Sequence, residues 1–313
     1  MKVIFMGTPD FAVGALESIL QAGHEVVCVV TQPDKPKGRG KEVQFSPVKQ
    51  CAVDHCLPVM QPVKVREKEQ IEELRKFAAD IFVVAAFGQI LPKEILSMPK
   101  YGCVNIHASL LPKYRGAAPI QWAVINGEKE SGVTIQQMAE GIDTGDILLK
   151  RSLLLDEKET GGSLYDKLSG LGADLIVEAL RDIEAGKLQP EKQDEESSTH
   201  VGKISKSMGL IDWNKSAEEL ERLIRGLNPW PSAYTFFRGK TWKIWEADVV
   251  KEERAERNEP GKICSVTKTS VIVHTGDGKL ALKSVQLEGK KRMAVKEFLL
   301  GYQIEAGEML GGE

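Results

Sequence analysis

Two polar side chains that can act on a carbonyl group stand at the end of a short apolar run, residues 103–106. Asn105 and His107 are two positions apart, and alternate side chains of a strand leave the same face. An amide N–H and an imidazole N–H directed at one point can stabilise the negative oxygen that forms when a carbonyl carbon is attacked. The alternative is that both side chains are buried in a tight turn and satisfied by backbone groups. The pair is therefore a candidate catalytic site for chemistry at a carbonyl.

A third polar group comes from a glycine-flanked acidic turn at residues 141–146. Its carboxylate, Asp143, is a further candidate site residue. An aspartate in such a turn more often caps its own backbone, which is the alternative interpretation.

Two other kinds of chemistry are disfavoured. The loop after the first apolar run lacks the Gly-x-Gly-x-x-Gly pattern, and Pro9 removes an N–H that would hold a pyrophosphate, which argues against a nicotinamide-dependent enzyme. The five histidines show no metal-binding spacing, and Cys51 and Cys56 have no second cysteine pair. We therefore predict no metal site.

The elements that must position these groups alternate between apolar runs and amphipathic stretches. The runs predict buried strands at 2–6, 25–30, 81–86 and 103–106, and the stretches predict helices at 11–22, 47–55 and 68–78. Such alternation indicates an α/β fold with a Rossmann-like, mostly parallel sheet, whose ligands bind at the carboxyl ends of the strands. Paired strands at 132–138 and 147–155 and a long helix at 163–185 complete this domain.

A change of pattern divides the chain. Residues 186–202 are polar and aperiodic and are predicted to be a linker. After a short helix at 217–226, strands separated by turns predict a small OB-like β-barrel. We therefore expect a catalytic domain at 1–202 and a second domain at 203–313.

Bulk properties are those of an ordinary globular protein. The chain has 313 residues, 42% of them hydrophobic and 28% charged, and no apolar run is long enough to cross a bilayer. Its five cysteines form no even framework, so we expect a reducing, cytoplasmic location. Residues 1–202 carry a net charge of -6 and residues 203–313 a net charge of +3, which is weak evidence for nucleic-acid contact by the second domain.

Several of these motifs together resemble the formyltetrahydrofolate-dependent formyltransferases: the run 105–112, Arg-Gly-Ala at 115–117 and Asp-Thr-Gly-Asp at 143–146. Residues 31–41 and 225–231 are further similar to those of the methionyl-tRNA formyltransferases, and the resemblance covers essentially the whole chain. Ser232 departs from that family's pattern at a turn where glycine is expected.

The resemblance implies an activity and its site. The enzyme would transfer a formyl group from 10-formyltetrahydrofolate to the α-amino group of methionine on initiator tRNA, for translation initiation, without a metal. Asn105 and His107 would stabilise the oxyanion, Asp143 would assist proton transfer, and His107 would be the acid for the leaving nitrogen. The folate donor would contact two segments: Ser109, Leu110, Leu111 and Pro112; and Phe87, Gly88, Gln89, Ile90 and Leu91. The second segment has a plain alternative as a strand-to-helix connection.

The resemblance also implies contacts with tRNA. A loop at 34–42 interleaves basic residues with Pro and Gly, so it should be exposed, and Arg39 would act at the end of the acceptor stem. The implied tRNA-binding residues are Lys35, Lys37, Arg39, Lys41, Arg238, Lys240 and Lys243. Each group can equally be a solvated charged surface. The family resemblance implies a monomer.

Two other functions remain open. The catalytic motif is shared with enzymes that act on small molecules, such as glycinamide ribonucleotide formyltransferase and formyltetrahydrofolate hydrolase. A nucleic-acid-binding protein with a catalytically silent Rossmann-like domain is the alternative outside enzymes.

Overall fold

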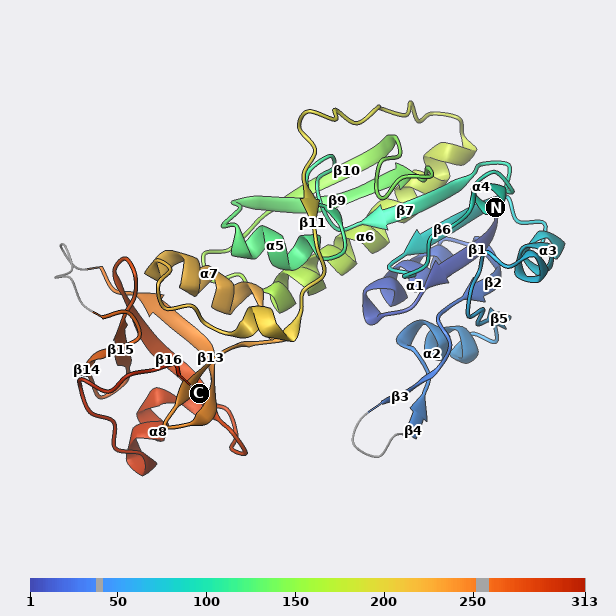
Figure 1. Ribbon diagram of the computed structural model, residues 1–313. Helices are drawn as coiled ribbons and strands as arrows, with labels where there is room; N and C mark the ends of the chain where they lie inside the picture. Colours follow the sequence, from blue (N-terminus) through green and yellow to red (C-terminus); the bar gives the residue numbers. More distant parts are fainter. Residues whose placement is uncertain (38–41, 252–258, 313) are drawn as a thin grey trace. The chain divides into compact units, whose positions relative to one another are not determined.

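The computed structural model describes residues 1–37, 42–251 and 259–312 (Figure 1). These form two compact units: the first contains Met1–Pro119, Glu130–Leu154 and Tyr165–Val201, and the second contains Ile120–Lys129, Leu155–Leu164 and Gly202–Glu313. The second unit therefore takes in two segments that precede residue 203. The division into domains at 202 and 203 stays a prediction.

A mixed sheet forms the centre of the first unit. Within the described chain its seven strands lie in the order β10-β9-β7-β6-β1-β2-β5. Their bounds are β1 Lys2–Gly7, β2 Glu25–Val30, β5 Val59–Met60, β6 Ile81–Ala85, β7 Cys103–His107, β9 Glu130–Gln137 and β10 Ile147–Leu154. The five strands from β7 to β5 are parallel, whereas β9 pairs antiparallel with both β7 and β10. From Val3 onward β1 is buried, as is all of β6. Strands that are buried on both faces have unbroken apolar sequences, as these two do.

Helices connect and cover these strands (Figure 1). They are η1 Asp10–Ala12, α1 Val13–Gln21, α2 Pro47–Asp54, α3 Lys68–Lys76, α4 Lys93–Leu96 and α6 Gly161–Glu184. One apolar cluster combines strand residues such as Ile4 and Phe82 with Leu74 of α3. Gly172 of α6 lies against Ile106 of β7 and Val133 of β9. The long helix thus covers the face of the sheet opposite to that of Asn105 and His107.

An antiparallel sheet forms the second unit. Its strands are β12 Ala233–Phe237, β13 Lys240–Val249, β14 Ile263–Val266, β15 Val271–His274, β16 Lys279–Leu287 and β17 Met293–Ala294, with β17 paired to β16 beside the path β12-β13-β16-β15-β14. Helices α5 Pro119–Ile125, α7 Ala217–Gly226 and α8 Val295–Gly301 accompany it. Trp242, Trp213 and Phe298 belong to one buried cluster of this unit.

The C-terminal segment brings the two edge strands of this sheet together. Ile263 N donates to Glu308 O at 2.8 Å, and Leu310 N donates to Gly261 O at 2.8 Å. Gly311 N donates to Phe236 O of β12 at 3.0 Å. The barrel-like closure expected from the sequence is therefore completed by residues 308–311.

The predicted fold class is confirmed: a mostly parallel α/β unit precedes an antiparallel β unit. The sequence did not predict the strands of two or three residues, which are too short for a periodic pattern: β3 Lys35–Lys37, β4 Glu42–Gln44, β5, β8 Arg115–Gly116, β11 His200–Val201 and β17. Within the described ranges, no helix is both long and apolar enough to cross a lipid bilayer.

Candidate functional site

Four polar side chains form one patch on the face of the sheet away from α6. In the antiparallel pairing of β7 and β9, Asn105 lies opposite Gln136 and His107 lies opposite Thr134. Side chains two apart on each strand share a face, so all four are neighbours. Thr134 and Gln136 are 0% and 1% exposed, and His107 is 6% exposed. The intervening residues are apolar: Val104, Ile106, Val133 and Ile135.

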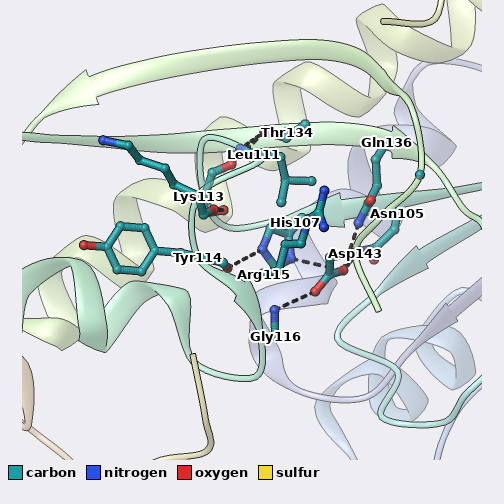
Figure 2. A network of polar contacts seen from close by, with 12 residues as sticks. Asn105, His107, Leu111, Lys113, Tyr114, Arg115, Gly116, Thr134, Gln136 and Asp143 are labelled. Carbon is teal, nitrogen blue, oxygen red and sulfur yellow. Dashed lines mark hydrogen bonds and ion pairs between the residues drawn. The ribbon is translucent and has the colours of Figure 1, made fainter. Parts of the chain in front are cut away.

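Asp143 is the centre of this patch (Figure 2). Its Oδ1 accepts a hydrogen bond from Gln136 Nε2 at 2.8 Å, and its Oδ2 accepts one from the backbone N–H of Gly116 at 2.8 Å. Asn105 Nδ2 and His107 Nδ1 each lie 3.5 Å from the same Oδ1. The two nitrogens therefore converge on one oxygen position, as the alternation along β7 predicts.

The second ring nitrogen of His107 fixes the orientation of the imidazole. Nε2 lies 2.9 Å from the backbone oxygen of Tyr114. A carbonyl oxygen only accepts hydrogen bonds, so Nε2 carries a proton and donates it there. Nδ1 is consequently the nitrogen that faces Asp143, and a proton on Nδ1 would be directed at the carboxylate.

Backbone conformation brings Asp143 and Gly116 to this point. Asp143 has φ +53°, a left-handed conformation that aspartate adopts more readily than most residues. Gly116 has φ +108°, and a Cβ at that position would lie 2.4 Å from Val201 O of β11. Gly145 is equally constrained, since a Cβ there would lie 1.6 Å from Gln137 O. Gly145 is thus needed for the close approach of the acidic turn to β9, and Gly116 for the close approach of β8 to β11.

Thr134 holds the turn that follows β7. Its hydroxyl donates to Ser109 O at 2.7 Å and accepts from Leu111 N at 3.1 Å. The Ser109 hydroxyl donates to Lys113 O at 2.6 Å. Ser109 is therefore engaged within the turn, and its backbone is fixed directly beside His107.

Arg115 is a buried charge to which the sequence patterns assigned no separate role. It is 1% exposed, and its Nη1 and Nη2 donate to the two carboxylate oxygens of Glu195 at 2.8 Å each. Its Nε donates to Gln193 Oε1 at 3.0 Å. The hydrogen-bonded pair raises the pKa of Arg115 and lowers the pKa of Glu195. The contacts of 191–201 show that part of the predicted linker packs on the site.

The residues expected at the folate differ widely in exposure. Phe87, Leu91, Ser109 and Leu111 are buried, at 2%, 4%, 2% and 1% exposure. Gln89 uses its side chain on Val65 N and Pro62 O, at 2.8 and 3.0 Å. The remaining members are at least partly exposed: Gly88, Ile90, Leu110 and Pro112. These four are therefore the members whose surface is open to a ligand.

The residues expected at tRNA lie on different elements. Lys35 and Lys37 belong to β3, and Arg39 and Lys41 lie outside the described residues.

In the second unit, Arg238 pairs with both oxygens of Glu308 at 2.9 Å, so its charge is already compensated. Lys240 is exposed, and Lys243 Nζ lies 5.7 Å from the ring centre of Trp245. Arg292, 5.0 Å from the same ring, joins this basic and aromatic surface.

One group of potential metal ligands lies apart from this site. Among the described residues, Glu17, Cys51 and His55 each place one ligand atom within 4.8 Å of the others. Burial, together with Glu17 and Asp54, raises the pKa of Cys51 to about 11. Without a metal this group therefore presents a thiol at neutral pH, and a metal ion would have to displace its proton. That the chain needs no metal stays a prediction.

Comparison with known proteins places this geometry in a family. A formyl transferase model matches residues 1–180, and a model of the formyl transferase C-terminal domain matches residues 203–303. A methionyl-tRNA formyltransferase of Agathobacter rectalis is 60% identical over 307 residues, which cover 98% of this chain and 98% of that protein. The chain belongs to the methionyl-tRNA formyltransferase family. A methionyl-tRNA formyltransferase of Lachnospira eligens is 58% identical, and the aligned region covers 99% of this chain and 100% of that protein.

Solved structures extend the likeness beyond the methionyl-tRNA formyltransferase family. WlaRD, a sugar 3N-formyl transferase solved in the presence of dTDP and 5-N-formyl-THF, matches with a TM-score of 0.67 at 23% identity, covering 93% of this chain and 99% of that one. HypX from Aquifex aeolicus matches with a TM-score of 0.64 at 19% identity, covering 97% of this chain and 49% of its own. At these identities the likeness shows the fold alone.

The polar residues that sequence reasoning missed differ in the signal they left. Thr134 and Gln136 alternate with the apolar residues Val133 and Ile135, so the same alternation that identified Asn105 and His107 was available. Gln193 lies in a segment without a periodic pattern and left no such signal.

Proposed function

We propose that this chain transfers a formyl group from 10-formyltetrahydrofolate to the α-amino group of methionine carried by initiator tRNA. The observation that carries the proposal is the convergence of Asn105 Nδ2 and His107 Nδ1 on one carboxylate oxygen of Asp143, which places an amide donor, an imidazole and a carboxylate at one point. Similarity to methionyl-tRNA formyltransferases over 98% of the chain supports the acceptor.

The first step forms a bond between the amine nitrogen and the formyl carbon. An unperturbed α-amino group has a pKa of about 7.7 to 8.0, and the neighbouring ester lowers the pKa of this amine, so a large fraction of it is a free nucleophile near neutral pH. As the C–N bond forms, the formyl oxygen becomes negative. The Asn105 amide and the His107 imidazole stabilise this oxygen, and one well-aimed donor contributes on the order of 3 kcal/mol. No covalent intermediate with the enzyme is needed.

The second step breaks the bond between the formyl carbon and folate N10. The attacking nitrogen loses a proton, and N10 gains one as it leaves. Asp143 accepts the proton from the ammonium, directly or through water, and His107 delivers a proton to N10. His107 Nδ1 lies 3.5 Å from Asp143 Oδ1, so the two groups proposed to move protons are direct neighbours.

Two segments are proposed to hold the donor. Half-buried Leu110 and Pro112 and exposed Ile90 offer apolar surface, and the exposed backbone of Gly88 offers hydrogen-bonding groups. A flat pterin needs both kinds of contact.

Contacts with tRNA are proposed for the basic residues of β3 and the following loop, with Arg39 at the end of the acceptor stem. In the second unit we assign them to Lys240 and Lys243, with Arg238 contributing once its pairing with Glu308 is exchanged for phosphate. Binding through phosphates would weaken as salt rises. We further propose a monomer that acts in the cytoplasm, where its free cysteines would stay reduced.

The deciding experiment is formylation of charged initiator tRNA by the purified chain with 10-formyltetrahydrofolate, with glycinamide ribonucleotide as the competing acceptor. Turnover of the small acceptor without transfer to tRNA would overturn the acceptor assignment. His107→Ala should abolish most transfer, and a rate near that of the unmodified chain would refute the site. Arg39→Ala should lower kcat/KM for tRNA while sparing folate binding.

A further inference from the structure

Residues 191–201, here called the bracing segment, contact both sides of the candidate site. Gln193 Nε2 donates to the backbone oxygens of Asp143 and Gly145, at 2.8 and 2.6 Å. Its Oε1 accepts from Arg115 Nε at 3.0 Å. One carboxamide therefore joins the turn that carries Asp143 to the loop that follows β7.

The same segment also holds the partner of His107. Thr199 accepts from Tyr114 N through its hydroxyl and from Arg115 N through its backbone oxygen, each at 2.8 Å. Tyr114 O is the acceptor for His107 Nε2. The bracing segment therefore hydrogen-bonds directly to Tyr114, the partner of the imidazole, and to the backbone oxygen of Asp143.

From these contacts we infer that Gln193 is a positioning residue for Asp143, and that Gln193 and Thr199 are the residues through which the bracing segment supports the catalytic site. Asp143 has a left-handed backbone, which most side chains disfavour, so contacts to its own carbonyl are needed to hold it. Buried Arg115 in turn fixes the far end of the Gln193 side chain, because its guanidinium is bound by Glu195 as well. The inference rests on the proposed function, since it concerns the rate of that reaction.

Gln193→Glu separates the two contacts of this side chain. A glutamate keeps an oxygen for Arg115 Nε but replaces the donor with an oxygen that faces the carbonyls of Asp143 and Gly145. The control is Glu196→Gln, the reverse exchange at an exposed position of the same segment. Both variants, with Gln193→Ala, would be assayed in the full chain for kcat and for KM of folate and tRNA, with circular dichroism to establish folding.

We expect kcat of Gln193→Glu and Gln193→Ala to fall by roughly tenfold to a hundredfold, since small misplacements of a catalytic group have effects of this size. KM values and the control should stay near those of the unmodified chain. In an Asp143→Asn background, Gln193→Glu should lower kcat little further, because residues that act through one another are not additive.

Three outcomes would overturn the inference. A kcat for Gln193→Glu equal to the control would remove the positioning role. A full further loss in the Asp143→Asn background would show that Gln193 acts elsewhere. If the unmodified chain transferred no formyl group to tRNA, the proposed function would fail, and the inference with it. If Gln193→Ala fails to fold, the kcat of Gln193→Glu still tests the positioning role, because this variant retains the contact with Arg115.

Discussion

Asp143→Asn is the substitution whose cost follows most directly from the geometry. Asparagine has the same shape, but one of its two oxygens is replaced by an NH2 group. In the native chain one carboxylate oxygen accepts from Gly116 N and the other from Gln136 Nε2, each at 2.8 Å. Either orientation of the new amide therefore points a donor at a donor.

The expected effect on stability is moderate and the effect on rate is large. Losing one hydrogen bond to a charged group should lower the free energy of unfolding by about 1.5–3 kcal/mol. The free energy of unfolding of native proteins is about 5–15 kcal/mol, so the variant should stay folded. Among the contacts described, Asp143 provides the only carboxylate next to His107 Nδ1. The substitution removes this proton acceptor, so kcat should fall by about 10² to 10⁴.

Denaturant unfolding and single-turnover formylation of charged tRNA would measure the two effects separately. Asp146→Asn is the matched control, because it makes the same exchange in the same turn. The contact described for Asp146 is made by its backbone oxygen, which accepts from Gln137 N. Its rate should stay within about twofold of the native value. A folded Asp143→Asn variant with a native rate would refute the assigned role of this carboxylate.

Other substitutions test neighbouring features. Gln136→Met should lower kcat about threefold to tenfold with little loss of stability, because the lost hydrogen bond to Asp143 is offset by removal of the buried, unpartnered Gln136 Oε1. Gln137 lies on the other face of β9, where its Nε2 donates to Cys103 O. Gln137→Met should therefore lower the free energy of unfolding and leave kcat unchanged. A fall in kcat without a loss of stability would contradict the assignment of Gln136 and Gln137 to opposite faces. Gly170→Ala, in an exposed and open part of α6, should stabilise the fold by about 0.5–1 kcal/mol in thermal unfolding, and a decrease would argue against the helix there. Exposed Cys56 should be alkylated rapidly, whereas burial raises the pKa of Cys103 to about 12, so its labelling should stay slow from pH 7 to about 9; comparable rates would contradict its burial.

Local patterns in the sequence determined the fold class and the first two members of the site. A strand shows its two faces as alternating residue types, so the spacing of Asn105 and His107 is enough to place their side chains together. Long apolar runs such as those of β1 and β6 are buried on both faces, and this also is visible in one dimension. Local patterns were not enough to place Asp143 in the site, because only the family resemblance connected its turn to β7.

Tertiary structure decided what surrounds those residues. The pairing of β7 with β9 is a long-range contact, so the sequence did not show that Gln136 would lie opposite Asn105. Gln193 is 50 residues from Asp143 and 78 from Arg115, in a segment without periodicity that was predicted to be a linker. Its contacts depend on the path of the chain between distant elements, for which neighbouring residues carry no pattern. The sequence alone therefore identified the reacting groups, and the folded chain identified the residues that hold them in place.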